Sequence, residues 1–163
     1  MKIQILDKAK KKKILAELER FGMSKIPELL IRTGRERIRA YSGNLSKEEI
    51  MDLWKILPVE GIGLYVGKDI LDRDGVREVR LSVDGIHTWA GQIDGRILKL
   101  DEEQEVEWFF GRNVELVGDV EDGFVVVRSA DDKDFVGMGK VGNGGKVLYN
   151  FLPKERRRKS QTI

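Results

Sequence analysis

The sequence predicts an α+β protein: an N-terminal α/β part with an antiparallel sheet and flanking helices, followed by a small C-terminal β pseudo-barrel. In the first half, helical patterns alternate with short extended runs. The second half holds a single helical pattern and about five short extended runs separated by Gly and Asp turns. Because the pattern changes around Gly91–Gly95, we predict two domains, residues 1–92 and 93–163.

Helix signals mark two segments of the first half. Asp7 is placed to cap a helix that runs to about Phe21, and Gly22 is its predicted stop. Ser46-Lys-Glu-Glu49 is a capping box, which opens a second helix through Leu57. Both helices carry apolar residues at helical spacing on one face, so each is expected to pack against a sheet.

Extended runs separated by turn residues predict the strands. LLIRTGRERIRAYSG is expected to form a hairpin around Thr33–Glu36, and residues 61–70 and 76–85 are expected to pair around the turn Leu71–Gly75. The second half is predicted to contain a strand at 95–100, a helix from Asp101 to Gly111, and strands at 112–121, 123–131, 135–141 and 146–152.

The run GMGKVGNGGK, residues 137–146, contains the pattern G-x-G-x-x-G that seats dinucleotide phosphates. A nucleotide fold needs a helix after this pattern, but KVLYNFLP predicts a strand, and Gly145 stands where a P-loop needs its lysine. We therefore interpret Gly137 and Gly139 as positions where another backbone or a helix approaches closely. Asn143–Gly145 is predicted to supply a turn with positive φ angles.

Residue types that carry out catalysis are scarce. Cysteine is absent and His87 is the only histidine, which excludes thiolate catalysis and Cys-based or His-rich metal sites. We interpret His87 as structural, in a loop or at a strand end. Asp131, Asp132 and Asp134 are interpreted as a solvated turn, because the glycine and distal Glu of a calcium-binding loop are missing. The sequence predicts no catalytic residue, no metal and no cofactor.

Composition bears on location and partners. No apolar run approaches the ~18–20 residues of a membrane span, and the first 15 residues do not fit a signal peptide. We therefore expect a cytoplasmic protein with no membrane partner. Charged residues make up 36% of the chain, against about 25% in ordinary domains, which favours the ion-pair-rich surface of a thermophile. The net charge of +2 is small, but residues 154–159 hold five basic residues and one acid.

Two further basic clusters lie in the first half. Lys8–Lys13 falls on the first predicted helix and is interpreted as a solvated face, with a polyanion contact as the alternative. Arg32, Arg35, Arg37 and Arg39 decorate the predicted hairpin, where the last two share one sheet face because they are two residues apart. The role of both clusters is left open.

The order of these segments resembles a known family. GRILKL, WFFGRNV, GFVVVRSAD and FVGMGKV, between about Gly95 and Leu152, look like a PUA domain, the small pseudo-barrel found attached to RNA-modifying and ribosome-assembly proteins. RERIRAYSG, the capped helix after it, and GIGLYVGK with VREVRLSVDGIHTWAGQ resemble the pre-PUA domain of the Nip-seven ribosome-biogenesis family. The resemblance covers nearly the whole chain, which looks like an archaeal member.

The resemblance implies a non-catalytic RNA-binding protein that acts in large-subunit assembly and pre-rRNA processing. It also implies that single-stranded regions of rRNA or pre-rRNA bind the PUA domain, while other assembly proteins bind the N-terminal domain. The RNA-facing surface of PUA domains is typically formed by the turn after the helix, here Gly111 and its neighbour, together with the last strands. In this sequence the implied RNA-binding residues are Arg112, Lys140, Lys146, Lys154, Arg156, Arg157, Arg158 and Lys159.

Three alternatives stay open. The basic tail, residues 154–159, could instead be a disordered solubilising end. The protein could be an RNA-targeting accessory subunit of a methyltransferase or pseudouridine synthase that is encoded separately. It could also be an enzyme whose site is not recognisable from the sequence.

Overall fold

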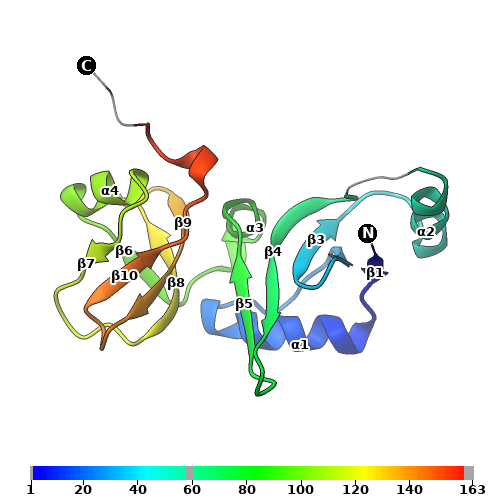
Figure 1. The fold of residues 1–163 in the computed structure, drawn as a ribbon, viewed down its shortest axis with the longest axis horizontal. Helices are drawn as coiled ribbons and strands as arrows, with labels where there is room; N and C mark the ends of the chain where they lie inside the picture. Colours follow the sequence, from blue (N-terminus) through cyan, green and yellow to red (C-terminus); the bar gives the residue numbers. More distant parts are fainter. Residues whose placement is uncertain (1, 58–60, 160–163) are drawn as a thin grey trace. The chain divides into compact units, whose positions relative to one another are not determined.

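The structure is a computed structural model that describes residues 2–57 and 61–159. The chain divides into two compact units, residues 1–92 and 93–163, and each is built on its own five-stranded sheet (Figure 1). Helices accompany the strands in both units, so the predicted α+β class is confirmed. No helix within the described ranges is long and apolar enough to cross a bilayer.

The sheet of the N-terminal unit is an antiparallel meander, in which each strand pairs with the next one in the sequence. The predicted hairpin around Thr33–Glu36 joins its second and third strands. The register shifts between Ile38 and Arg39, where a β-bulge interrupts the pairing with the fourth strand. The strands are β1 (Ile3–Ile5), β2 (Leu29–Thr33), β3 (Arg37–Tyr41), β4 (Leu64–Leu71) and β5 (Arg77–Leu81).

Side-chain caps determine where the helices of this unit begin. Asp7 accepts a 2.9 Å hydrogen bond from the backbone N–H of Lys10, and Gly22 ends the segment with a φ angle of 95°. Ser46 and Glu49 form the predicted capping box, so both predicted helices are confirmed. The segments are α1 (Lys8–Leu18), the 3-10 turn η1 (Glu19–Phe21), α2 (Lys47–Ile56), α3 (Val83–Thr88) and the 3-10 turn η2 (Ala90–Gln92).

Two elements of this unit differ from the sequence prediction. The interpretation of His87 as part of a loop or strand end was wrong, because it lies in the last turn of α3, where it is exposed. Ser82 begins α3 by accepting a 3.0 Å hydrogen bond from the N–H of Gly85. A Cβ atom on Gly85 would collide with the carbonyl oxygen of Val66, so glycine lets α3 approach β4. β1 was not predicted, because three residues are too few to form a recognisable pattern.

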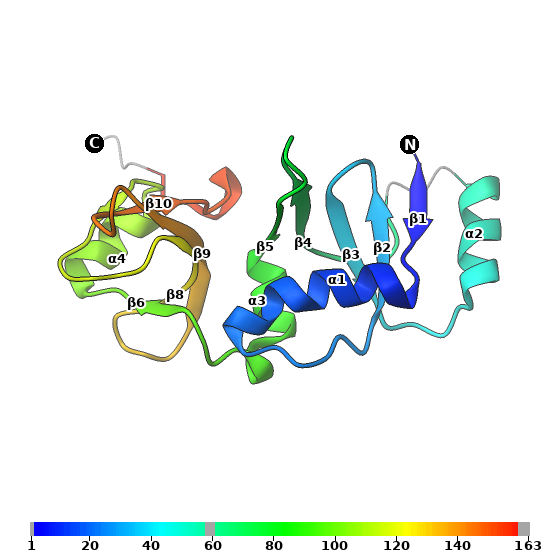
Figure 2. The ribbon, with the colours of Figure 1, turned by 90° about the horizontal axis from the view of Figure 1, so that it is seen from below.

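One face of the N-terminal sheet packs against α1, which runs along it (Figure 2). Ile14 and Leu18 of α1 are buried there. The apolar residues that surround this contact are Leu30, Ile38, Val66, Val79, Leu81 and Trp89. On the opposite face, Ile50 of α2 forms a buried cluster with Ile3 of β1 and Ile31 of β2. On this second face α2 packs over β1 and β2. The part of the face formed by β3, β4 and β5 carries charged side chains.

The sheet of the C-terminal unit curls into a half-barrel (Figure 2), with strand order β6-β8-β9-β10-β7. β6 runs parallel to β8, and the other neighbouring strands pair antiparallel. Of the strand predicted at 112–121, only two residues pair. The elements are β6 (Ile97–Lys99), α4 (Glu102–Phe109), β7 (Val114–Glu115), β8 (Gly123–Arg128), β9 (Phe135–Gly142), β10 (Val147–Asn150) and the 3-10 turn η3 (Lys154–Arg156).

The glycine-rich run forms the β9–β10 hairpin. Residues 143–145 have φ angles of 56°, 65° and 82° and supply the predicted left-handed turn. A Cβ atom on Gly137 would lie 3.1 Å from a ring carbon of Trp108 in α4, and one on Gly139 would lie 2.6 Å from Leu148. Since a strand follows the run and these glycines admit close neighbours, their interpretation as architectural is confirmed.

Candidate nucleic-acid interface

The C-terminal end of α4 is tied to the last strand of the half-barrel. Gly111 adopts a φ angle of 77° and turns the chain away from the helix. The side-chain amide of Asn150 donates hydrogen bonds to the carbonyl oxygens of Trp108, at 2.9 Å, and Arg112, at 3.0 Å. This amide therefore holds the turn after α4 beside the end of β10.

The basic tail returns to this end of α4 (Figure 1). The N–H of Arg158 donates a 2.7 Å hydrogen bond to the carbonyl oxygen of Phe109, and its guanidinium lies 5.4 Å from the centre of the Phe109 ring. The Nε of Arg157 donates to the carbonyl oxygen of Leu152 at 2.8 Å, and its side chain fills the space that a Cβ atom on Gly111 would need. The tail thus packs on the protein instead of forming a free solubilising end.

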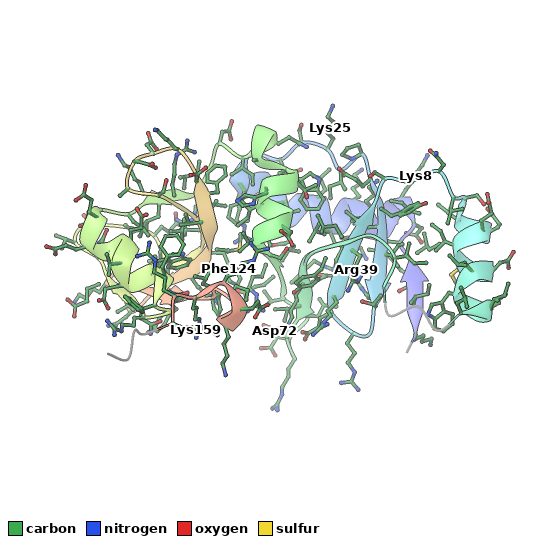
Figure 3. The ribbon with its side chains drawn as sticks, turned by 90° about the horizontal axis from the view of Figure 1, so that it is seen from above. Lys8, Lys25, Arg39, Asp72, Phe124 and Lys159 are labelled. Carbon is green, nitrogen blue, oxygen red and sulfur yellow. The ribbon has the colours of Figure 1, made fainter. Side chains whose placement is uncertain are left out.

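Electrostatics favours this arrangement. The C-terminal end of a helix carries a partial negative charge, which attracts cations within the last turn. We name the basic end the six cations of the tail and of the turn after α4, of which Arg157 and Arg158 contact the end of this helix: Arg112, Lys154, Arg156, Arg157, Arg158 and Lys159. Lys154, Arg156 and Lys159 are exposed to solvent. Lys159 lies beyond η3 (Figure 3).

Not every cation of the basic end carries an uncompensated charge. Arg112 Nη1 lies 3.0 Å from a carboxylate oxygen of Glu107, and its guanidinium lies 5.1 Å from the centre of the Phe110 ring. The structure therefore makes Arg112 a weaker phosphate ligand than its position alone predicts.

Lys140 and Lys146 lie apart from the basic end, on β9 and in the β9–β10 turn. The register pairs Lys140 with Tyr149 on one side and with Phe124 on the other, so the three side chains share one face. Lys140 Nζ lies 5.1 Å from the centre of the Phe124 ring, which Figure 3 labels. Lys146 is exposed in the turn.

Two further aromatic side chains, Tyr149 and Phe151, join Lys140 and Phe124 and were not predicted from the sequence. The ring centres of Phe151 and Phe124 lie 5.8 Å apart. Tyr149 and Phe151 are 40% and 37% exposed, which is unusual for large side chains beside a core. We call Phe124, Lys140, Tyr149 and Phe151 the aromatic strip. The alternation of KVLYNFL places Tyr149 and Phe151 on one face, and this signal was available in the sequence.

An acidic hollow lies along α4 and borders the basic end at Arg158. Glu102, Glu105 and Asp131 line a hollow of about 290 Å³ together with Arg158. The Ser129 hydroxyl donates a 2.6 Å hydrogen bond to Asp131, and this bond and that from the N–H of Lys133 lower the pKa of the Asp131 carboxyl. Asp131, Asp132 and Asp134 are all exposed, as expected for a solvated turn. These carboxylates would repel a polyanion. The basic end and the aromatic strip are therefore the candidate binding surfaces of this unit.

The lysines of α1 differ in availability. Lys8, Lys12 and Lys13 are exposed, as a solvated face requires. Lys11 Nζ instead donates a 2.6 Å hydrogen bond to the carbonyl oxygen of Glu28, and burial lowers its pKa. The structure therefore removes Lys11 from any contact with a polyanion.

The C-terminal unit is a PUA-like domain, a class of domain associated with RNA binding. Residues 96–158 match the family described as the methyltransferase RsmF PUA domain. This match covers less than half of the chain, so it identifies a domain and leaves the family of the whole protein open. A search of curated proteins finds no match to the chain. Membership of the Nip-seven family and the roles of the individual cations stay predictions.

Proposed function

We propose that this protein is a non-catalytic RNA-binding protein that acts in archaeal ribosome biogenesis, in large-subunit assembly and pre-rRNA processing in the cytoplasm. RNA binds the basic end and the aromatic strip of the PUA-like domain, and assembly proteins bind the N-terminal unit. One observation carries the proposal: the basic tail folds back onto α4 and gathers cations at one end of the domain. Arginine forks onto phosphate oxygens, which gives affinity with little sequence selectivity.

Removing the charges of the tail tests this proposal. The substitutions Arg156→Ala, Arg157→Ala and Arg158→Ala together are expected to weaken binding to single-stranded RNA by at least about tenfold, about 1.4 kcal/mol. The slope of log affinity against log salt is negative, and its magnitude should decrease by about 2, because each lost phosphate contact removes roughly 0.7 from it. Filter binding of a single-stranded RNA across a salt series measures both quantities.

Two controls separate charge from folding. The substitutions Lys154→Gln, Arg156→Gln and Lys159→Gln alter exposed side chains and keep the contacts of Arg157 and Arg158 with the domain. They should reproduce most of the loss. Removing three scattered exposed lysines, with Lys25→Gln, Lys47→Gln and Lys55→Gln, should leave RNA affinity nearly unchanged. Equal affinity of the wild type and both tail variants would contradict the assignment of the tail.

A separate prediction concerns base stacking on the aromatic strip. Tyr149→Ala is expected to lower affinity for single-stranded RNA by roughly 5- to 150-fold, because stacking of a base on an aromatic ring contributes about 1–3 kcal/mol. The salt slope should stay the same, since no charge is removed. Tyr149→Phe keeps the ring and should bind like the wild type. If Tyr149→Ala and Tyr149→Phe bind equally well, bases do not stack on this ring.

A second candidate function is an RNA-targeting accessory subunit of an RNA-modification enzyme, a methyltransferase or a pseudouridine synthase. The similarity of residues 96–158 to the PUA domain of a methyltransferase family favours it. Purification of the protein from its own cells distinguishes the two functions. Pre-ribosomal particles in the purified material support a role in assembly, whereas a stoichiometric modification enzyme supports the targeting role.

A further inference from the structure

The second face of the N-terminal sheet carries a row of cations across β3, β4 and β5. The register places Arg37 of β3 opposite Lys68 of β4, and Lys68 opposite Arg80 of β5. Residues directly opposite one another in an antiparallel pair point to the same face. Arg39 and Tyr65 form the neighbouring pair on this face. Figure 3 labels Arg39 among the side chains of this sheet.

These cations surround a groove of about 530 Å³, which we call the basic groove. The residues that line it are Thr33, Gly34, Arg35, Glu36, Arg37, Arg39 and Lys68. Four of the seven are cationic and Glu36 is the only acid. The β2–β3 turn supplies Arg35, and β3 and β4 supply the remaining cations. Part of the arginine cluster that the sequence left without a role therefore converges on one concave surface.

Of the residues that line the groove, only Glu36 carries a carboxylate. Among the described residues, Arg35, Arg37, Arg39 and Lys68 form no ion pair with a carboxylate. The guanidinium of Arg37 lies 5.9 Å from the centre of the Tyr65 ring, and Arg39 Nη1 donates a 3.1 Å hydrogen bond to the carbonyl oxygen of Gly63. Like charges directly opposite in a sheet are destabilising. The position of Arg37 opposite Lys68 therefore favours an anion bound beside them.

Arg32 differs from the cations of the basic groove because it is paired with a carboxylate. It belongs to the same cluster in the sequence, but it points to the opposite face of the sheet, where its guanidinium pairs with the buried carboxylate of Asp69. Asp69 is 3% exposed and also pairs with Arg77. The fold therefore neutralises Arg32 and leaves the charges of the basic groove available.

We propose that the basic groove is a second RNA-binding surface, which holds the phosphate backbone of the RNA. Three of its four cations are arginines, whose planar fork fits phosphate oxygens and whose face stacks on bases and aromatic rings. Tyr65 and the guanidinium of Arg37 supply such a stacking surface beside the phosphate ligands. The choice of RNA over another polyanion rests on the proposed function, because the second unit of the same chain is a PUA-like domain.

The test compares RNA binding of full-length variants. Arg35→Gln, Arg37→Gln and Lys68→Gln together remove three charges from the groove and leave Arg39, which contacts Gly63, in place. We expect RNA affinity to fall by about tenfold and the salt slope by about 2. The scattered variant with Lys25→Gln, Lys47→Gln and Lys55→Gln removes the same charge and should bind like the wild type. A photo-crosslink from bound RNA to the peptide that contains Tyr65 gives a readout in the unmodified protein.

The outcomes separate the two proposals. If the groove variant weakens binding and the tail variant does not, the groove is an RNA site and the assignment of the tail is wrong. If the groove variant binds RNA like the wild type and no crosslink reaches β3 or β4, the groove is not an RNA site and this proposal is wrong. Failure of the wild-type chain to bind RNA at all overturns both proposals. Thermal unfolding of each variant excludes a loss of binding that follows from misfolding.

Discussion

Trp108→Ala is expected to destabilise the C-terminal unit by about 3–5 kcal/mol, the usual cost of truncating a fully buried aromatic side chain. Trp108 is 0% exposed, and its indole Nε1 donates a 3.1 Å hydrogen bond to the carbonyl oxygen of Val136. The substitution leaves a cavity beneath α4 and removes the ring that packs against Gly137. A unit of this size has a small core, so the loss is a large part of its stability.

The effect should be confined to one unit of the chain. Hydrogen exchange is expected to accelerate for the amides of β8, β9 and β10, while the amides of β2 and β3 keep their protection. RNA binding through the basic end should fall as α4 loses its place in the core. Trp108→Phe retains most of the buried area and serves as the control, with an intermediate loss. Unchanged exchange in β9 after Trp108→Ala would show that this ring does not hold the domain together.

The sequence predicts well the helices that begin at a capping residue and the turns that have characteristic residue types. Asp7, Ser46 and Asp101 each begin a helix through a hydrogen bond that depends on a few neighbouring residues, so local sequence is sufficient. The turn of residues 143–145 follows from residue types that accept a positive φ angle. α3 could not be predicted because it has six residues, including Gly85 and three β-branched residues, and tertiary contact with β4 decides its conformation.

Two features of the candidate sites could not be predicted from the sequence: which arginines are ion-paired and which aromatic side chains are exposed. A sequence shows that arginines are close along the chain, but it does not show which of them a carboxylate neutralises. Arg32 and Asp69 lie on different strands, so only the fold brings them together. Glu107 and Arg112 are five residues apart, and the turn after α4 decides whether they meet. The aromatic strip was missed for another reason. The alternation of KVLYNFL predicts a shared face for Tyr149 and Phe151, but their exposure depends on how the sheet curls.

Asp69→Ala is expected to destabilise the N-terminal unit by about 3 kcal/mol, because breaking a buried ion pair leaves its partners without compensation. The side chains of Arg32 and Arg77, which are 21% and 20% exposed, both pair with the same oxygen of this carboxylate, Oδ2. Without it, two cations remain partly buried beside each other on the face that α1 covers. Thermal or urea unfolding of the purified variant measures the loss.

Asp52→Ala, which removes an exposed acid from α2, is the matched control and should change stability by less than about 0.5 kcal/mol. Asp69→Asn keeps an acceptor oxygen and should fall between the two. RNA affinity of Asp69→Ala, measured well below its unfolding temperature, should equal that of the wild type. The freed Arg32 points away from the basic groove, so it cannot add a phosphate ligand there. Tighter RNA binding by Asp69→Ala would contradict this separation of the two faces and would place Arg32 on the RNA-binding surface.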